Sequence, residues 1–363
     1  MRRVVKVSRI RIIITIIVVV LTTLLTGCTG KEPNEIAYVV ALGIDSTDDG
    51  NYKITIQYAN TTQISGGASE SGGKAGSEIV DNVTIEAPNI YAGVGLANNI
   101  VSKSFSMSHA KLIVFSKEIA EKGVKDMIET LVRSEEIRPD VFIAVANTTA
   151  NDYLTSVSPE MEVNPAQYYQ LIYQKNQLVG IPDGQLREFF TGLYTDNYDS
   201  ILPVAGVIDG SGGNSQNDDK GQSKDSQNEG SEGSSESLDS FVSKSLIENE
   251  KEKDAEKNTS KYEYDIKNYV GGETTIEKKN KAEAIGAAVF EKDKMVGELG
   301  EVETEICKML KGDYTYSYLT YYNNDTPDIP ITVKTTQQKK PKYKIDTDKK
   351  TVDIELYIES DLY

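Results

Sequence analysis

Few side chains in this sequence belong to types that commonly carry out chemistry. His109 is the only histidine, so a histidine-rich zinc site cannot form, and no G-x-S-x-G serine or paired cysteine accompanies it. Because His109 directly precedes an apolar run, we interpret it as a packed residue and not as a catalytic base. Asp45, Asp48 and Asp49 lack the alternating ligands and final glutamate of an EF-hand, so they indicate a hairpin turn. The sequence therefore predicts a protein that is not an enzyme and holds no metal.

Cys28 is the exception, because its surroundings predict a covalent modification. A basic N-terminus is followed by an apolar run over 12–25, shorter than the roughly 20 residues that span a bilayer. The run ends in Leu25-Thr26-Gly27-Cys28, which resembles a bacterial lipobox. We therefore predict that residues 1–27 are a signal peptide and that Cys28 carries a diacylglycerol and an N-acyl lipid, with no other cofactor. An uncleaved anchor helix is the alternative.

The charge of the chain supports attachment to a membrane through lipid. The formal charge is −17, and removal of the five basic residues of the signal leaves −22. Such a surface repels nucleic acid and anionic headgroups, whereas each buried methylene of an acyl chain contributes about 0.8 kcal/mol. We therefore expect the mature chain to lie outside the cytoplasm, with no nucleic-acid partner. An acylated Cys28 also leaves Cys307 without an intramolecular disulfide partner.

Composition divides the mature chain into two folded domains. Residues 209–262 are rich in Ser, Gly, Asn and acidic residues and nearly free of aromatic or branched side chains, which predicts a disordered acidic linker. Residues 65–77 have a similar composition and predict a flexible loop. An N-terminal domain at 28–208 and a C-terminal domain at 276–363 remain.

Hydrophobic patterns in the N-terminal domain predict both strands and helices. Residues 37–44 and 52–58 flank a turn and predict an antiparallel hairpin. Residues 111–115 and 141–146 flank a helix that begins at Ser116, and a unit of this length usually has parallel strands. Further helices are predicted after Pro88, after Asn164-Pro165 and over 186–193. The predicted fold class is α+β (mixed α/β), with mixed sheets packed with helices.

The C-terminal domain has less helix to cover its strands. Residues 284–290 and 294–299 predict a hairpin, and a helix over 301–310 is expected to end at Gly312. Strand patterns follow at 314–322, 331–335, 343–345 and 352–358. Because the apolar face of each element must pack against a partner layer, one helix is too little to cover these strands. We therefore expect a bare apolar sheet face, as in a domain that is truncated at its C-terminus.

Three strings in order resemble the Ger(x)C family, the C-subunit lipoproteins of spore nutrient germinant receptors. They are NEIAYVVALGIDSTDDGNYKITIQYAN, SMSHAKLIVFSKEIAEKGVKDMIETLVRSEEIRPDVFIAVA and IGAAVFEKDKMVGEL. The second string contains the family's E-I-R-P step, here Glu136-Ile137-Arg138-Pro139. The resemblance covers about 28–205 and 283–360. The chain departs from the family at Thr29-Gly30, where Trp-Asp is common, and at its end, where members continue with further helices and strands.

The resemblance implies a receptor subunit lipid-anchored to the outer face of the inner spore membrane, beside integral membrane A- and B-type subunits. It does not imply that this subunit touches the germinant. We hypothesise that the folded domains bridge or gate those subunits, with the helix over 116–133 and Glu136, Arg138 and Pro139 near the contact. An extracytoplasmic solute-binding lipoprotein is the alternative and should show two similar lobes around a cleft. An exported enzyme is a more distant third.

Overall fold

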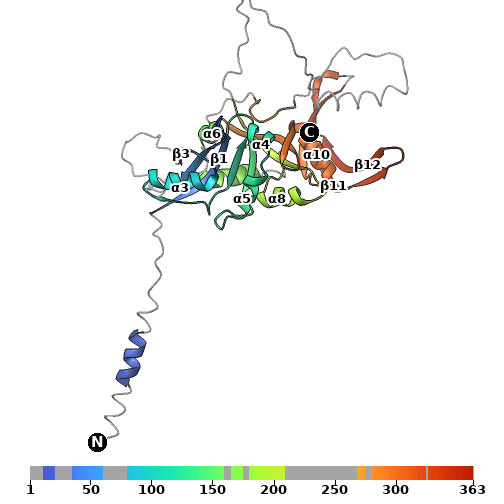
Figure 1. The fold of residues 1–363 in the computed structure, drawn as a ribbon. Coiled ribbons are helices and arrows are strands. Elements are labelled where there is room, and N and C mark those ends of the chain that lie inside the picture. The colour runs from blue at the N-terminus through green and yellow to red at the C-terminus, as the bar shows by residue number, and fades with distance from the viewer. Residues whose placement is uncertain are drawn as a thin grey trace, which may run out of the picture.

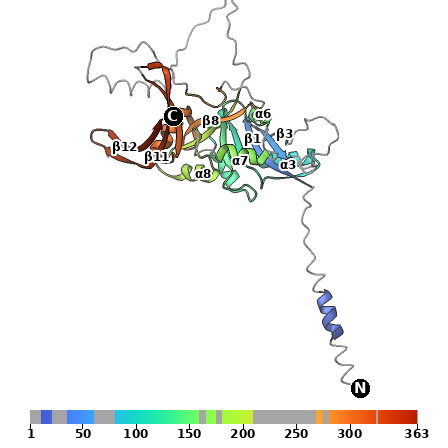
Figure 2. The ribbon, with the colours of Figure 1, turned by 180° about the vertical axis from the view of Figure 1, so that it is seen from behind.

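The structure, a computed structural model, describes residues 11–20, 35–59, 80–158, 165–174, 180–208, 268–274, 280–323 and 326–362. Cys28, the loop predicted at 65–77 and the linker predicted at 209–262 lie outside the described residues. Residues 11–20 form an exposed helix, and no helix within the described ranges is long and apolar enough to cross a membrane. The remaining residues form mixed sheets packed with helices (Figures 1 and 2), which confirms the predicted fold class.

The larger sheet has nine strands in the order β3-β2-β1-β5-β6-β7-β8-β9, with β4 paired to β1 outside this path. The three strands β3, β2 and β1 are antiparallel, β1, β5, β6 and β7 are parallel, and β7, β8 and β9 are again antiparallel. The predicted hairpin and the predicted parallel pair are thus confirmed. The strands are β1 (Ile36–Ser46), β2 (Tyr52–Ala59), β3 (Val80–Ala87), β4 (Ser104–Ser106), β5 (Leu112–Ser116), β6 (Phe142–Ala146), β7 (Ser200–Val207), β8 (Ala282–Glu291) and β9 (Lys294–Leu299).

Helices cover both faces of this sheet because its central parallel strands are apolar on both sides. In β5, Ile113 and Phe115 belong to one buried cluster and Leu112 and Val114 to another. The first cluster includes residues of four helices: α3 (Ile90–Ile100), α4 (Lys117–Lys122), α5 (Lys125–Val132) and α8 (Leu186–Tyr194). The second includes residues of α6 (Ala150–Ser156) and α7 (Pro165–Gln174). Packing against the first cluster fixes the position of α8 and of the loops at the two ends of α8.

The single helix predicted from Ser116 is wrong, because the chain forms two short helices there. Gly123 ends α4 with a φ of 123°, and the backbone N–H of Val124 donates to the Asp293 carbonyl at 2.9 Å. A Cβ at position 123 would lie 2.7 Å from Asp293 Oδ2. The break thus allows the turn between β8 and β9 to approach, a contact that local patterns cannot predict.

The segment after the predicted linker contributes to two sheets. Its first strands, β8 and β9, extend the larger sheet, whereas β10 (Tyr316–Asn323), β11 (Thr326–Asp346) and β12 (Thr351–Leu362) form a separate antiparallel sheet. The helix α10 (Glu301–Lys311) lies between them in sequence and ends at Gly312, as predicted, in the left-handed conformation. The two strands predicted over 331–335 and 343–345 are one continuous strand, β11. The fold therefore shares its larger sheet between the two predicted domains.

The second sheet exposes apolar side chains, as we expected. Val352, Ile354, Leu356 and Ile358 alternate along β12 and are between 37% and 56% exposed. Ile345 of β11, opposite Val352, is 69% exposed. One face of this sheet thus lacks a packed layer among the described residues.

Candidate functional site

The predicted contact residues lie in a rigid turn between α5 and β6, which we call the corner and define as Ser134–Asp140. The hydroxyl of Ser134 accepts hydrogen bonds from the N–H groups of Glu136 and Ile137, at 3.2 and 3.3 Å. Ile137 is buried in the first cluster, so it anchors the corner from below. Arg138 and Pro139, which follow Ile137 in the chain, are both exposed. The corner is therefore a fixed, accessible surface feature.

Arg138 and Pro139 make different contacts. The Arg138 guanidinium donates from Nε and Nη2 to the two carboxylate oxygens of Asp140, both at 2.9 Å. This pairing lowers the pKa of the Asp140 carboxyl and raises that of Arg138. The Pro139 carbonyl accepts from the backbone N–H of Arg187 at 3.0 Å, at the start of α8. Arg138 thus presents a preformed ion pair to solvent, and Pro139 ties the corner to α8.

Glu136 faces a hollow of about 500 Å³ beside the corner. Its Oε2 accepts from the backbone N–H of Met107 at 2.6 Å, which closes one edge of the hollow. The floor contains Phe105 and Met107, which are almost fully buried. The structure therefore places Glu136, but neither Arg138 nor Pro139, in the wall. The lining residues are Tyr91, Val94, Asn98, Phe105, Met107, Thr130, Arg133, Ser134, Glu135 and Glu136.

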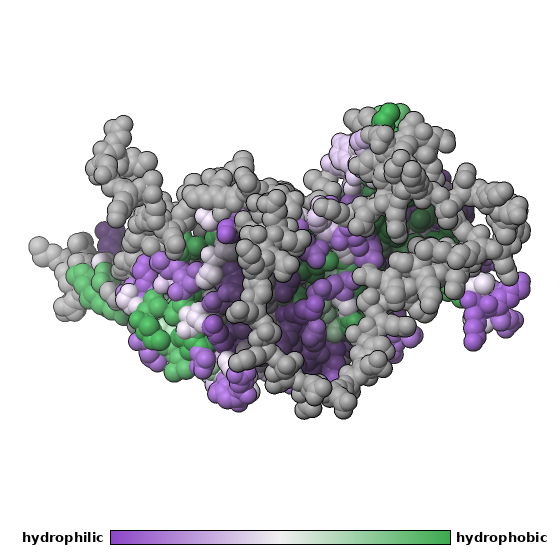
Figure 3. Space-filling model, turned by 90° about the horizontal axis from the view of Figure 1, so that it is seen from above, coloured by the Kyte–Doolittle hydropathy of each residue, from purple (hydrophilic) through white to green (hydrophobic). Residues whose placement is uncertain are grey.

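The wall formed by α3 continues into an exposed apolar surface. Tyr91, Leu96 and Ile100 are 39%, 47% and 69% exposed. Figure 3 shows hydrophobic residues at the left end of the molecule, the end at which Figure 1 shows both α3 and the exposed helix of residues 11–20. Our sequence reasoning missed this surface. The available signal was that Leu96 and Ile100 lie off the helical stripe that α3 buries.

Asp45 has a structural role that the sequence did not reveal. The predicted turn after it is present, with Gly50 at a φ of 83°. Asp45 itself is buried, and its carboxylate accepts from the N–H groups of Ala150 and Asn151 at 2.6 and 3.0 Å. Burial raises its pKa although both hydrogen bonds oppose the rise. Asp45 therefore caps the first turn of α6 from a neighbouring strand.

The other residues considered for chemistry have structural surroundings. His109 Nδ1 lies 3.0 Å from Ser108 Oγ, and its ring packs edge-on against Tyr38. Burial raises the pKa of the Cys307 thiol, which favours the unreactive protonated form. Within the described part of the chain no group of three or more His, Cys, Asp or Glu residues could hold a metal ion.

Comparison with known protein families assigns the chain to a class. Residues 30–207 match the family described as "Spore germination protein N-terminal domain", and residues 285–363 match "Spore germination B3/GerAC like, C-terminal". Together these matches cover well over half of the chain. The chain belongs to the Ger(x)C family of spore germination proteins, as its motifs indicated.

Individual relatives are more distant. Spore germination protein KC of Bacillus subtilis (strain 168) is 27% identical over 156 residues, which cover 42% of this chain and 38% of the relative. Spore germination protein GerQC of Bacillus cereus is 24% identical over 197 residues, 52% of this chain and 50% of the relative. The crystal structure of the GerBC protein has a TM-score of 0.38 and 14% identity, over 88% of this chain and 70% of that one. The chain thus spans half or less of the length of the curated relatives that it matches.

Proposed function

We propose that this protein is the lipid-anchored, non-catalytic subunit of a nutrient germinant receptor in spores. In this proposal Cys28 carries the lipid and holds the protein to the outer face of the inner spore membrane. The folded part contacts the integral membrane A- and B-type subunits. The observation that carries the proposal is the pair of family matches at 30–207 and 285–363.

The position of β1 supports an orientation toward the membrane. Only seven residues lie between Cys28 and Ile36, where β1 begins, and the eight steps along the chain span at most about 29 Å. Ile36 pairs with Ser104 of β4, and β4 packs beside α3. An anchor at Cys28 therefore keeps the exposed residues of α3 and the neighbouring hollow close to the bilayer. Confinement of this kind raises the effective concentration of the surface toward embedded partners, so a weak interface is sufficient.

The continuity of the larger sheet disfavours the alternative of a solute-binding lipoprotein. Such a protein is expected to have two similar lobes around a cleft. Here β7 and β8, from the two predicted domains, are adjacent strands of one sheet. The receptor-subunit function is therefore the one that we test.

The first test is germination of spores that carry Cys28→Ala, compared with a deletion of the whole gene. Loss of light scattering and release of dipicolinic acid are followed after nutrient addition. We expect both strains to lose the response to a nutrient while they still germinate under a receptor-independent trigger. A Cys28→Ala strain that germinates like its parent, beside a deletion strain that does not, would exclude the lipid anchor.

The second test addresses the corner through co-purification with the membrane subunits. Arg138→Ala removes an exposed ion pair from the corner. We expect Arg138→Ala to reduce recovery of the complex. Because we place the segment 116–133 near the contact as well, the neutral control is Lys349→Ala, which removes the exposed ion pair with Asp346 between β11 and β12 and should leave recovery unchanged. Equal recovery from both variants would place the contact elsewhere.

A further inference from the structure

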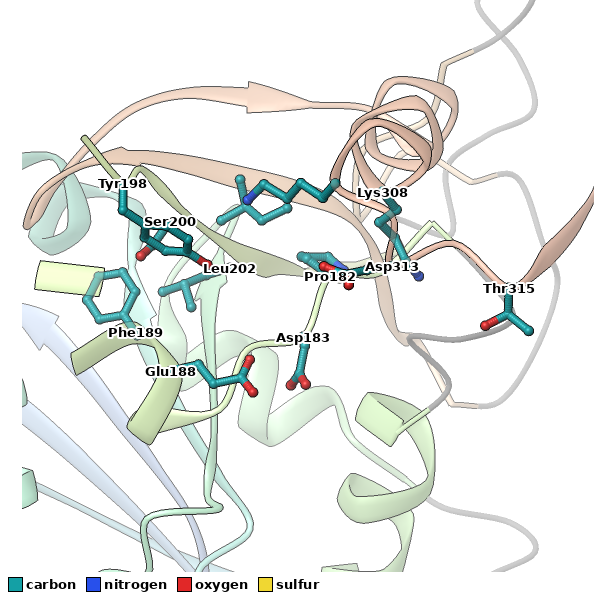
Figure 4. Close-up of a pocket in the computed structure, with 12 residues that line it drawn as sticks. Pro182, Asp183, Glu188, Phe189, Tyr198, Ser200, Leu202, Lys308, Asp313 and Thr315 are labelled. Atoms are coloured by element: carbon teal, nitrogen blue, oxygen red, sulfur yellow. The ribbon is translucent and has the colours of Figure 1, made fainter. Parts of the chain in front are cut away.

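A second cavity, separate from the corner, lies between α8 and α10. We call it the α8–α10 cavity, and its volume is about 320 Å³, at the small end of the range for ligand pockets. One side is formed by Asp183, Glu188 and the residues at the start of β7, and the other by Lys308 and Asp313 (Figure 4). More than one hundred residues of sequence separate the two sides. The cavity is therefore a product of the tertiary fold.

Two carboxyl groups dominate the lower edge of the cavity. Asp183 and Glu188 point into the same space in Figure 4, and their side chains are hydrogen bonded to each other. Burial raises the pKa of both carboxyls, and the charge of Asp183 raises that of Glu188 further. Asp313 adds negative charge, whereas the Arg187 side chain is 62% exposed and lies 3.9 Å from Glu188. Asp183 and Glu188 thus place two carboxyl groups side by side at this edge, with the exposed Arg187 beside them.

Lys308 and Lys311 of α10 line the edge of the cavity opposite Asp183 and Glu188, and both contact other groups of the protein there. Lys308 is buried, and its Nζ donates to the Ile181 carbonyl at 3.1 Å. Burial lowers the pKa of Lys308, while the charges of Glu305, Asp313 and Asp183 oppose this effect. Lys311 Nζ lies 5.5 Å from the centroid of the Tyr198 ring. The upper edge therefore holds its cations against a carbonyl and an aromatic face, and a further cation is best accommodated near the carboxyl pair.

The walls of the cavity suit an organic cation better than a metal ion. Phe189 and Tyr198 present aromatic rings and Leu202 an aliphatic side chain. Aromatic faces attract cations electrostatically, through the quadrupole of the ring. No cluster of metal-ligating residues occurs within the described residues, those of this cavity included. A ligand with one positive and one apolar part fits both kinds of wall.

We propose that the α8–α10 cavity binds a small organic molecule through its protonated amine, with the ammonium between Asp183 and Glu188 and the apolar part against Phe189 and Tyr198. The N–H groups of the ammonium donate to the two carboxylates. This proposal stands independently of the proposed function, because it depends only on the geometry of the cavity.

The test is isothermal titration calorimetry on the full chain, purified with its anchor in detergent at pH 6. The probes are butylammonium, with butanol and butyrate as neutral and anionic controls, and 2-aminobutyrate to distinguish a simple amine from an amino acid. We expect butylammonium, 2-aminobutyrate or both to bind, and butanol and butyrate to bind at least tenfold more weakly.

Variants locate the binding site. Asp183→Asn and Glu188→Gln keep the shape of each side chain and should each weaken binding at least tenfold. Glu121→Gln, which changes an exposed carboxyl on α4, should bind like the wild type. Circular dichroism confirms that each variant is folded, and two variants are available in case one is not. The proposal is overturned if neither amine binds, if butanol or butyrate binds as tightly, or if the folded variants bind normally.

Discussion

Replacement of Asp45 by alanine tests the view that this residue connects β1 to α6. The carboxylate of Asp45 accepts from two backbone N–H groups at the start of α6, those of Ala150 and Asn151. Ala150 is fully buried, so its N–H has no access to water once the acceptor is removed. Asn151 is half-buried, so its N–H can be hydrated at lower cost. The other cap of the helix, Thr149, serves the N–H of Asp152 and cannot replace Asp45.

The magnitude follows from these contacts. A buried donor without a partner costs about 1–3 kcal/mol, and loss of a capping side chain costs about 0.5–2 kcal/mol. Removal of a carboxylate whose pKa is raised by burial offsets part of this cost. We therefore expect Asp45→Ala to lower the free energy of unfolding by about 2 kcal/mol. Asp45→Asn retains one acceptor oxygen and should lose about 1 kcal/mol.

The assay is urea unfolding of both variants and the wild type at several pH values. The raised pKa of Asp45 means that the folded state holds its proton at a pH where the unfolded chain, with a pKa of about 3.9, has lost it. The advantage of the wild type over Asp45→Asn should therefore decrease as the pH rises from about 4 to the raised pKa, and then stay constant. A loss below about 0.5 kcal/mol for Asp45→Ala would refute the capping role. An advantage that grows with pH would instead show that the two capping hydrogen bonds outweigh burial in setting the pKa of Asp45.

Two further predictions concern residues outside the corner. Gly123→Ala should destabilise by at least about 1–3 kcal/mol in the same urea assay, because position 123 has a positive φ and a Cβ there would meet Asp293. Gly95→Ala is the control: it lies on the exposed side of α3, where a Cβ meets nothing, and should stabilise the protein by about 0.5–1 kcal/mol. A similar effect of Gly123→Ala and Gly95→Ala would contradict the strain that we assign to position 123. Tyr169→Phe should lower the free energy of unfolding by about 1–3 kcal/mol, because it removes the buried hydroxyl that donates to Gln57 Oε1 at 2.5 Å. The measurement is thermal unfolding, and a variant that unfolds at the same temperature as the wild type would argue against this hydrogen bond.

The sequence was informative where short-range pattern decides the structure. The β1–β2 and β8–β9 hairpins follow from apolar runs around turn residues, and the parallel pair β5–β6 follows from a strand, helix and strand of ordinary length. The stop of α10 at Gly312 follows from the left-handed conformation that glycine adopts readily. These features depend on neighbours within a few residues in the chain, so a single sequence contains the information.

Long-range partners account for what was missed. In α10, Ile306 is 48% exposed while Glu305 and Lys308 are buried, the reverse of what the character of these side chains alone would indicate. Glu305 Oε1 accepts from Ser317 Oγ at 2.6 Å, and Lys308 donates to a backbone carbonyl. Those partners make burial of charged groups tolerable. The α8–α10 cavity arises from the same packing. Neither the burial of Glu305 and Lys308 nor the cavity could therefore be predicted from the periodicity of α10.

The placement of the predicted linker explains why composition and sheet topology divide the chain differently. Val207 at the end of β7 pairs with Ala282 at the start of β8, and the N–H of Ile208 donates to the Lys281 carbonyl at 2.8 Å. The intervening segment thus begins and ends at adjacent positions of the sheet, and its residues 268–274 pack on the fold before β8, where the N–H of Gly271 donates to the Ile285 carbonyl at 3.0 Å. If residues 209–262 behave as the flexible chain that their composition predicts, closing a loop of that length costs only about 2.3 kcal/mol more than closing a four-residue loop. The pairing of two apolar strands inside a nine-stranded sheet can offset a cost of that size. A long polar insertion thus marks a loop between adjacent strands and not the border of the larger sheet.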